Sequence, residues 1–397
     1  MDLMDLMGQM NPKRRDGRSG PARRAGLRRL LAGVVIALLT LALLYGAGVI
    51  YRQASQANET PPGTLLPGEA MWGSWPSYLF GVNDGVNWDP QRNMDIPPVG
   101  PNIQARLKAA HVPIARVWFF QRSLVDQRPL SDAEQLQKLQ AVQNAGMRCF
   151  ANLPTENSIA YDLHLVTLLR GKCAFYEVMN EPDIEGVSST AYLAFWNSFV
   201  PQARALDPGA RFGGPADYSN QGAECSYYAN GTSACFLQKV LAGMAKSGVP
   251  PDFVTYHWYP CWQDTASECL AKADGFSAAA QQVLTWTKQA FPGKSIPVGL
   301  SEWNAHPGSP SYMNDGSWMA QFVTHALLSM RASGLAFAME FDVAGYGNYG
   351  ADDMFDIFHD GAPKAQFTAF ARLIASARSH TAPPSPTPSP ALQPSPS

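Results

Sequence analysis

Between residues 76 and 380 the chain alternates short apolar runs with longer segments whose apolar residues recur at helical spacing. A short, nearly continuous apolar run bounded by polar, Gly or Pro residues is typical of a parallel strand that is covered on both faces. Eight such runs are predicted as strands, at Tyr78–Asn83, Pro113–Phe120, Met147–Leu153, Phe175–Met179, Arg211–Ala216, Asp252–Tyr259, Ile296–Asn304 and Leu335–Asp342.

A helix is predicted after every strand. The predicted helices are Asn102–Ala110, Ser131–Gly146, Tyr161–Leu169, Ser189–Leu206, Cys235–Lys246, Gly275–Ala290, Trp318–Ser333 and Lys364–Ala377. Eight strand–helix units in one domain predict an α/β fold of the (β/α)8 TIM barrel type. The main structural alternative, an open doubly wound sheet, normally has a Gly-rich phosphate turn after its first strand, and the segment from Gly81 to Gly85 lacks that spacing.

The first 51 residues have a different character from the barrel segment. Residues 1–29 carry a basic run, and the 22 residues of Leu30–Tyr51 contain no charge. This is long enough to cross a bilayer as one helix, and the basic flank predicts a cytoplasmic amino end with the remainder outside. We therefore predict a single-pass signal-anchor at 30–51 that contacts the lipid bilayer. Cleavage near Ala57, which would release a secreted protein, is the alternative.

Composition sets the remaining domain limits. Residues 52–75 are predicted to be a linker, 76–380 the barrel domain, and the Pro/Ser-rich segment 381–397 a disordered tail. The net charge of -2 gives no reason to expect a nucleic-acid partner, and we expect a monomer. The ten Trp and fourteen Tyr residues suit a core, and they also suit a cleft that binds carbohydrate.

The chain has six cysteines, an even number that favours disulfides outside the cytoplasm. Sequence proximity favours the pairs Cys225–Cys235 and Cys261–Cys269, which leaves Cys149 and Cys173 on two consecutive strands. Fifteen pairings are possible in principle, and free buried thiols are the alternative. None of the cysteines shows C-x-x-C spacing, so no metal site is expected.

Polar residues collect where the predicted strands end, and in a barrel these ends converge on one site. Arg116 lies on the second strand, Asn180 and Glu181 follow the fourth, and Glu302 lies on the seventh. The sixth strand adds His257 and Tyr259. Two facing carboxylates, one protonated and one ionised, are what cleavage of a glycosidic bond requires.

The motifs resemble those of a known group of enzymes. Asn180-Glu181-Pro182 on the fourth strand and Ser301-Glu302-Trp303-Asn304 on the seventh look like the clan A retaining glycoside hydrolases. Gly213-Gly214-Pro215-Ala216 and Tyr256-His257-Trp258-Tyr259 bring the chain closest to the family 39 β-xylosidase-like enzymes, with cellulase-like members as second relatives. The resemblance extends over residues 78 to 378.

This resemblance implies roles for particular residues. Glu181 would be the acid/base, Glu302 the nucleophile, and Asn180 the partner of the hydroxyl beside the reacting carbon. Arg116 would hold Glu302 ionised. His257 and Tyr259 would bond the nucleophile from one face of their strand. Candidate sugar platforms are Trp118, Trp258, Trp262 and Trp303.

The expected function is therefore hydrolysis of O-glycosidic bonds in a poly- or oligosaccharide with retention of configuration, without metal or organic cofactor. The strand-eight sequence Met339-Glu340-Phe341-Asp342 departs from the family pattern, because it lacks a Trp and adds a third carboxylate, Glu340. Two alternatives remain open at this stage. The barrel could bind surface carbohydrate without turnover, or it could act as a transglycosylase on envelope polysaccharide.

Overall fold

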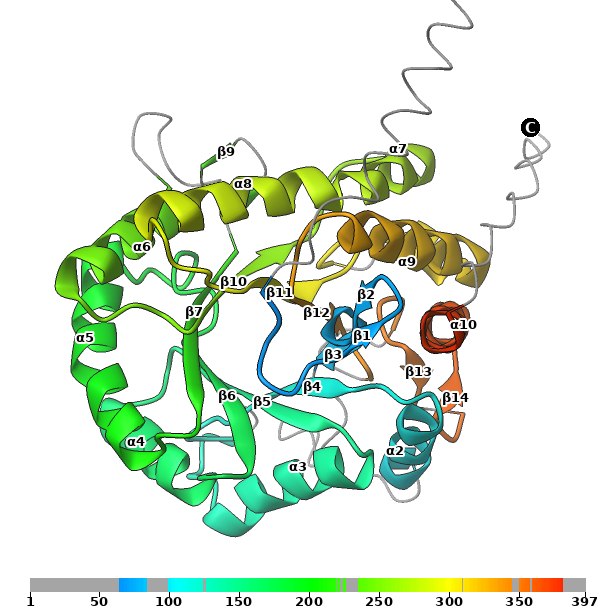
Figure 1. Ribbon diagram of the computed structural model, residues 1–397. Coiled ribbons are helices and arrows are strands. Elements are labelled where there is room, and N and C mark those ends of the chain that lie inside the picture. The colour runs from blue at the N-terminus through cyan, green and yellow to red at the C-terminus, as the bar shows by residue number, and fades with distance from the viewer. Residues whose placement is uncertain are drawn as a thin grey trace, which may run out of the picture. The chain divides into compact units, whose positions relative to one another are not determined.

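Eight parallel strands close into a barrel in the computed structural model of the protein (Figure 1). The structure describes residues 64–83, 99–123, 126–218, 220–221, 224–225, 235–308, 310–344, 350–357 and 359–380. The barrel strands are β3 (Gly81–Asn83), β4 (Ile114–Trp118), β5 (Arg148–Leu153), β6 (Cys173–Val178), β7 (Arg211–Asp217), β10 (Phe253–Trp258), β11 (Val298–Trp303) and β12 (Phe337–Phe341). The predicted (β/α)8 fold is therefore confirmed.

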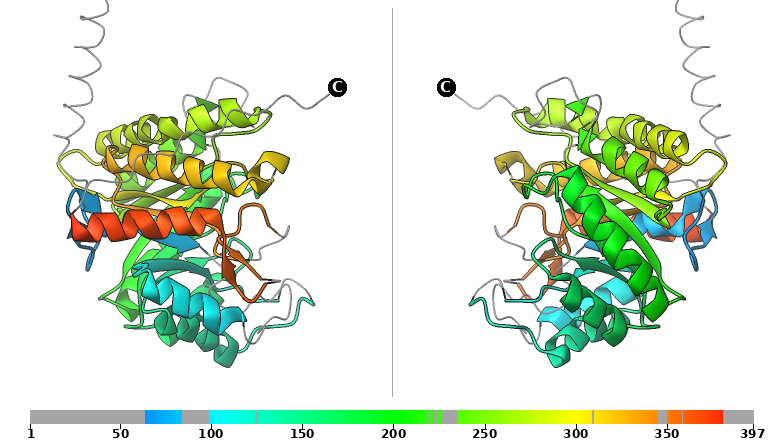
Figure 2. Two further views of the ribbon diagram at one scale, coloured as in Figure 1. Left: turned by 90° about the vertical axis from the view of Figure 1, so that its right-hand side faces the viewer. Right: turned by 90° about the vertical axis from the view of Figure 1, so that its left-hand side faces the viewer.

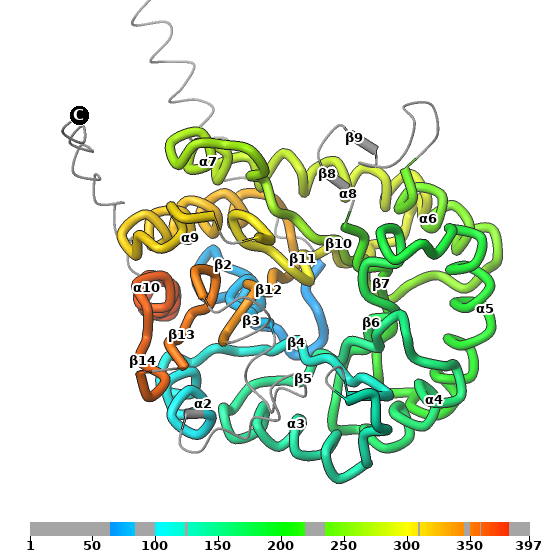
Figure 3. The backbone as a smooth tube through the Cα atoms, turned by 180° about the vertical axis from the view of Figure 1, so that it is seen from behind, coloured from blue at the N-terminus to red at the C-terminus, as the bar shows by residue number. Residues whose placement is uncertain are grey.

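Helices surround the barrel in chain order, and α10 closes the ring between α9 and α2 (Figures 1 and 3). They are α2 (Val99–Ala109), α3 (Asp132–Asn144), α4 (Ile159–Leu168), α5 (Ser189–Leu206), α6 (Phe236–Ser247), α7 (Ala266–Lys272), α8 (Phe276–Ala290), α9 (Gly316–Arg331) and α10 (Ala365–Ser379). Their starts follow local capping, as at Ser131, which accepts from the Glu134 N–H while the Glu134 carboxylate accepts from the Ser131 N–H. Sequence reasoning missed α7, although Thr265 and Glu268 form the same capping box.

The barrel interior is apolar toward the amino ends of its strands. Phe150, Phe175, Phe253 and Phe337 pack there, and their neighbouring ring centroids lie 5.2 to 6.1 Å apart. Tyr78 joins this layer through Phe175, at 6.3 Å. Gly299 makes room for this layer, because a Cβ at that position would lie 2.5 Å from the Phe337 ring. Side chains alternate along a strand, so the next inward positions form a polar layer nearer the carboxyl ends.

The folded unit begins earlier than the predicted boundary at residue 76. The hairpin of β1 (Met71–Trp72) and β2 (Trp75–Pro76) and the 3-10 helix Ser77–Phe80 precede β3, and Leu66 is buried. Residues 64–75 thus pack on the barrel, whereas a linker was expected. The first strand is also shorter than predicted, because Ser77–Phe80 turn as a 3-10 helix.

Short elements lie in the connections between the barrel strands and the helices. They are β8 (Asn220–Gln221), β9 (Glu224–Cys225), β13 (Phe355–Asp356), β14 (Ala362–Pro363) and the 3-10 helices Ala273–Gly275 and Ser311–Asn314. The β1–β2 hairpin lies at the end of the barrel opposite to β13 and β14 (Figure 2). The carboxyl ends of the strands point toward the β13–β14 end, since β13 follows β12 there.

Two predicted disulfides are present. Cys149–Cys173 joins the neighbouring strands β5 and β6, and Cys261–Cys269 ties the segment after β10 to α7. Cys235 is also disulfide-bonded, whereas the side chain of Cys225, its predicted partner, lies outside the described residues.

The expected anchor at 30–51, the first part of the linker and the tail at 381–397 also lie outside the described residues. Among the helices that the structure does describe, none has the length and apolar character needed to span a bilayer.

Candidate active site

Two glutamates face each other at the carboxyl ends of the strands. Glu181 follows β6 and Glu302 lies near the end of β11. His257, on β10, lies between them: its Nδ1 is 2.6 Å from Oε1 of Glu181 and 3.5 Å from Oε2 of Glu302. One ligand atom from each of the three residues lies within 4.8 Å of the other two. The fold therefore brings together the two carboxylates that the sequence singled out.

Glu302 is a buried carboxylate that receives two strong donors. The Arg116 guanidinium donates to Oε1 at 2.7 Å, and the Tyr259 hydroxyl donates to Oε2 at 2.8 Å. Arg116 and Tyr259 both act as hydrogen-bond donors to the Glu302 carboxylate, so these two contacts favour its ionised form. The predicted contacts of Arg116 and Tyr259 with Glu302 are thus present, whereas His257, predicted to bond Glu302, forms its hydrogen bond with Glu181.

Arg116 also holds the residues around Glu302. Its Nε donates to Glu177 at 2.6 Å, and its second terminal nitrogen donates to Oδ1 of Asn180 at 2.6 Å. Thr155 fixes the Asn180 backbone, donating to its carbonyl oxygen at 2.6 Å and accepting from its N–H at 3.1 Å. Arg116 binds the side-chain oxygen of Asn180, and Thr155 binds its backbone. The position of the Asn180 amide nitrogen at the site is therefore fixed.

The charges in this network oppose the cost of burial. Burial alone would lower the pKa of the Arg116 guanidinium, but Glu177 and Glu302 raise it above its usual value. Burial would raise the pKa of Glu177, but Arg116 and His257 lower it. Arg116 and Glu177 thus form a fully buried ion pair, to which Asn152 adds a hydrogen bond of 2.9 Å.

The pKa of Glu302 is raised, whereas the sequence analysis expected Arg116 to hold Glu302 ionised. Burial is the largest influence and raises its pKa above the usual value, while His257 and Arg116 act in the opposite direction. Arg116 was expected to leave Glu302 ionised by charge alone. The structure adds that this charge first has to offset the loss of water around a buried carboxylate.

Glu181 lies in a setting that favours the protonated form. Burial, followed by the charge of Asp183, raises the pKa of Glu181 to about 8. Its side chain is 16 % exposed, so the carboxyl group remains accessible from outside the barrel. Burial is the largest influence on the pKa of the neighbouring His257 and lowers it below its usual value. A carboxyl group that keeps its proton near neutral pH is suited to general acid catalysis.

The backbone around Glu181 adopts an uncommon conformation. Met179 has a φ of 67° and Glu181 a φ of 45°, values that L residues rarely adopt. The Glu181 N–H donates to the carbonyl of Ala216 at 3.1 Å, and the Glu181 carbonyl accepts from Ile184 and Glu185. Such strain persists only where surrounding contacts determine it, which is typical of functional sites.

The tryptophans predicted as sugar platforms differ in their accessibility. Trp303 is fully buried and packs edge-on against Phe276 of α8, so the described structure gives no sugar access to it. Trp258 is partly buried against the core between the barrel and the helices. Trp118 is 7 % exposed and stacks on Phe341, the aromatic residue that β12 supplies at the end of the strand. The prediction that Trp303 is a sugar platform is therefore wrong, and Trp303 is a core residue.

Glu340 lies outside this site. It is fully buried on β12, one residue from the inward-facing Met339, and its charged neighbours are Asp352, Asp353 and Lys364. Burial and the two aspartates raise the pKa of Glu340 well above its usual value, so this side chain is a buried neutral acid. The third carboxylate of the sequence is therefore no competitor for the role of Glu181 or Glu302.

Sequence reasoning missed Glu177, Asp183 and Tyr218. Glu177 was visible in principle, because it lies two residues after the inward-facing Phe175 on the same strand. Asp183 and Tyr218 meet through a hydrogen bond of 3.0 Å from the Tyr218 N–H to Oδ1 of Asp183. No local pattern announces that contact, since it joins the turns after β6 and β7.

Glu181, His257 and Glu302 are also the described group whose ligand atoms lie close enough together to hold a metal ion. A cation there would need Glu181 to lose its proton, and it would lie near the Arg116 guanidinium bonded to Glu302. Both conditions oppose cation binding. The group therefore fits acid–base chemistry better than metal coordination.

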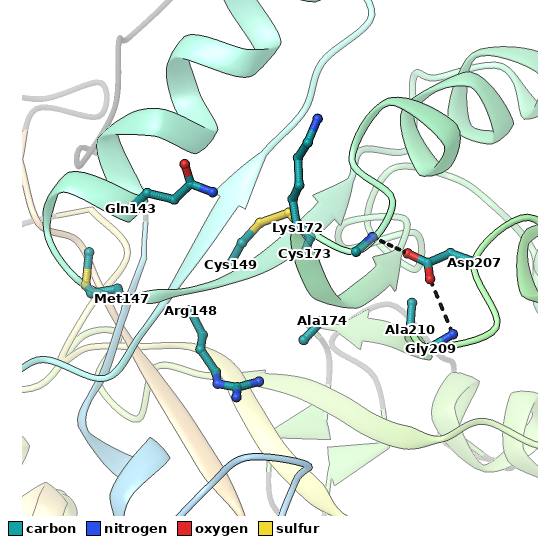
Figure 4. A pocket seen from close by; sticks show the side chains of 11 residues that line it. Gln143, Met147, Arg148, Cys149, Lys172, Cys173, Ala174, Asp207, Gly209 and Ala210 are labelled. Carbon is teal, nitrogen blue, oxygen red and sulfur yellow. Dashed lines mark hydrogen bonds between the residues drawn. A yellow bond between two sulfur atoms is a disulfide. The ribbon is translucent and has the colours of Figure 1, made fainter.

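A cavity of about 440 Å³ lies at the other end of the barrel (Figure 4). It surrounds the Cys149–Cys173 disulfide at the amino ends of β5 and β6, and Lys172 and Asp207 also line it. Asp207 accepts hydrogen bonds from the backbone of Gly171 and Gly209. In TIM barrels this end carries stability, whereas the chemistry lies at the carboxyl ends of the strands.

The chain is similar to known proteins in part of its sequence and in its fold. No protein-family model matches the chain. A β-xylosidase of Caldicellulosiruptor saccharolyticus is 24 % identical over 165 residues, which are 39 % of this chain and 30 % of that protein. The match thus spans less than a third of the curated relative's length.

Solved structures match a larger share of the chain. A glucosidase from Croceicoccus marinus has a TM-score of 0.57 at 13 % identity and covers 79 % of this chain and 69 % of its own. A monomeric β-xylosidase from Caulobacter crescentus CB15 has a TM-score of 0.55 at 17 % identity, with 75 % and 68 % coverage. A family 51 α-L-arabinofuranosidase from Bifidobacterium longum has a TM-score of 0.55 at 14 % identity, with 80 % and 76 % coverage. The chain thus shares the barrel fold of these glycoside hydrolases, and the sequence match with a β-xylosidase agrees with the predicted resemblance to the family 39 β-xylosidase-like enzymes.

Replacing Arg116 with methionine should lower the free energy of unfolding by about 3–5 kcal/mol, because Glu177 and Glu302 would remain buried without their common partner. Urea denaturation measures the change. The matched control is Arg128→Met, which breaks a surface pair with Glu134 in which Arg128 is 42 % exposed, so the loss of stability should be much smaller. Equal losses in the two variants would contradict the buried network.

Proposed function

We propose that this protein is a retaining O-glycosyl hydrolase that cleaves a poly- or oligosaccharide by double displacement. The observation that carries the proposal is the spacing of the catalytic pair, because oxygens of Glu181 and Glu302 lie within 4.8 Å of each other. Retaining glycosidases place the two carboxyl groups about 5–5.5 Å apart, whereas inverting enzymes leave about 6.5–9.5 Å for a water molecule. The close spacing supports the retaining mechanism.

In the first step the protonated Glu181 gives its proton to the leaving oxygen while ionised Glu302 attacks the sugar carbon. The bond to the leaving group breaks, and an ester forms between the sugar and Glu302. In the second step the ionised Glu181 takes a proton from water, whose oxygen attacks the same carbon and releases Glu302. Glu181 ends protonated and Glu302 ionised, so neither step consumes a cofactor.

Neighbouring residues prepare each carboxylate for its role. Arg116 and Tyr259 hold Glu302 by two donors, so both of its oxygens have fixed positions. Asn180 has its oxygen bound to Arg116, which directs its amide nitrogen as a donor to the hydroxyl beside the reacting carbon. His257, 2.6 Å from Glu181, keeps the acid oriented as its charge changes between the steps.

The names of the similar proteins suggest which sugars to test as substrates. The proteins with similar sequence or structure are named as a β-xylosidase, a glucosidase and an arabinofuranosidase. We propose β-linked xylose and glucose as the first sugars to test, and the buried, paired carboxylates favour turnover over binding alone.

Glu302→Gln should abolish hydrolysis, because an amide is no nucleophile. Glu181→Ala should lower kcat on unactivated glycosides by about 10²- to 10⁴-fold. Azide should restore part of the Glu181→Ala activity, since it attacks the glycosyl-enzyme without help from a base. Aryl-glycosides and oligosaccharides provide the assay, with thermal unfolding to show that each variant is folded. Full activity of either variant without azide would exclude the pair.

Hydrolysis should decline as pH rises through about 8, because the pKa of Glu181 lies there and its ionised form has no proton to donate. Asp183→Asn removes a negative charge that raises this pKa, so the alkaline limb of kcat/KM should move to lower pH. The control is Asp274→Asn, an exposed aspartate paired with His325, which should leave the limb in place. An unmoved limb in Asp183→Asn would refute the electrostatic role of Asp183.

We also propose that residues 30–51 anchor the protein in a membrane with the barrel outside, on the basis of the uncharged 22-residue run and its basic amino-terminal flank. Amino-terminal sequencing of the mature protein tests the anchor. An intact amino terminus in the membrane fraction is expected, whereas a chain that begins at Asn58 would indicate a secreted protein.

A further inference from the structure

Trp262 presents an indole ring to solvent on a rigid support. It is 42 % exposed and is the exposed large hydrophobic residue of the described chain. It follows β10 and lies next to Cys261, whose disulfide to Cys269 ties this segment to α7. Its backbone N–H donates to Asp264 at 3.0 Å, and the Cys261 N–H donates to Ala305 at 3.1 Å. Tryptophan is enriched at binding interfaces, because its ring offers a large apolar face beside a polar N–H.

A row of aromatic rings connects Trp262 with the catalytic pair. Tyr259, which donates to Glu302, has its ring centroid 6.2 Å from that of Tyr218. Tyr218 in turn lies 6.0 Å from Trp262, with the two rings nearly perpendicular. Exposure increases along the row, from 3 % at Tyr259 to 42 % at Trp262. The row therefore runs from the nucleophile outward to the rim of the barrel.

The same row adjoins the acid side of the site. The Tyr218 N–H donates to Asp183, two residues after Glu181, and the Glu181 N–H donates to Ala216. Strands β7 and β10, which carry Tyr218 and Trp262 at their carboxyl ends, lie between β6 and β11 in the barrel. A ligand that extends from the catalytic pair along this arc would pass Tyr218 before it reached Trp262.

We propose that Trp262 stacks against a sugar residue of a carbohydrate chain that continues beyond the residue held at Glu181 and Glu302. The inference rests on the proposed function and defines its substrate class: an oligo- or polysaccharide, rather than a glycoside with a single sugar. The ring offers an apolar face that matches the C–H face of a pyranose. Asp264, His306 and Lys272 border it with polar groups for hydroxyls, since His306 packs 5.7 Å from Trp262 and Asp264 bonds Lys272 at 2.9 Å.

The combination of an aromatic face and nearby polar groups distinguishes a sugar from a purely apolar ligand. A lipid or an apolar protein segment would offer no hydrogen bond to the Asp264–Lys272 pair, whereas sugar hydroxyls both donate and accept hydrogen bonds. The second argument is that the row of rings from Tyr259 to Trp262 is continuous with the catalytic pair. A carbohydrate chain bound at Glu181 and Glu302 could therefore follow this row and reach Trp262.

The test uses the full-length protein with Trp262→Ala and Trp262→Phe, assayed on xylo- and cello-oligosaccharides of increasing length and on the matching aryl-monoglycosides. For wild type, kcat/KM should rise with chain length. Trp262→Ala should lower kcat/KM on the longer chains about tenfold more than on the aryl-monoglycosides, mainly through KM, and a tenfold change corresponds to about 1.4 kcal/mol. Trp262→Phe should recover most of the difference, because it keeps an aromatic face.

Trp72→Ala provides the matched control. Trp72 is partly exposed at the opposite end of the barrel, where it stacks on Phe80 at 6.0 Å. Its replacement should change the two substrate classes by the same factor. An equal loss on both classes in Trp262→Ala, or a wild-type enzyme without any preference for longer chains, would overturn the proposal.

A binding measurement separates this inference from the proposed function. Calorimetry of the same oligosaccharides with Glu302→Gln, and with Glu302→Gln combined with Trp262→Ala, requires no turnover. Tighter binding of longer chains that is lost with Trp262 supports the subsite even if hydrolysis fails. Length-independent binding, or no binding of either series, would overturn the subsite even if aryl-glycosides are hydrolysed.

Discussion

The buried guanidinium of Arg116 is the interaction on which the site depends. It lies between Glu177 and Glu302, at 2.6 and 2.7 Å, and also bonds Asn180. Removing three charges from water is costly, and only short, charge-assisted bonds on nearly every donor offset this cost. The aromatic layer around Phe150 closes the barrel beneath the network and excludes water from that side. One side chain thus fixes the positions of Glu302 and Asn180 and the charge balance of the interior.

Most of the architecture could be predicted because its signals are local. All eight strands correspond to apolar runs in the sequence, and α5 has the predicted bounds Ser189–Leu206 because capping at Ser188 and the Asp207-Pro208-Gly209 stop are written into adjacent residues. The two glutamates could be found for a related reason: each lies where an apolar run gives way to polar residues, and parallel strands end on one face of a barrel. The first strand was overestimated because Ser77–Phe80 is as apolar as a strand, yet it turns.

The side-chain directions could be predicted less well. Glu302 and Trp303 are adjacent, so a strand cannot direct both into the barrel, and the same holds for His257 and Trp258. Register shifts in the pairing of β10 and β11 decide which member points inward, and such irregularities depend on the neighbouring strand. Glu340 follows the inward-facing Met339, so the alternation of side chains along β12 directs it away from the site. The contact of Asp183 with Tyr218 joins two turns, which no pattern within one segment encodes.

The environments of the two glutamates also exclude an exchange of their roles. Glu302 has one donor on each oxygen, Arg116 and Tyr259, so an added proton would displace a bond from one of them. Glu181 has no cation of its own and lies near Asp183, so an added charge there would be repelled. A single proton shared between the two carboxylates therefore resides on Glu181, although burial raises the pKa of both. The asymmetry comes from the residues beside each glutamate, because Arg116 and Tyr259 donate to Glu302 whereas Asp183 lies near Glu181.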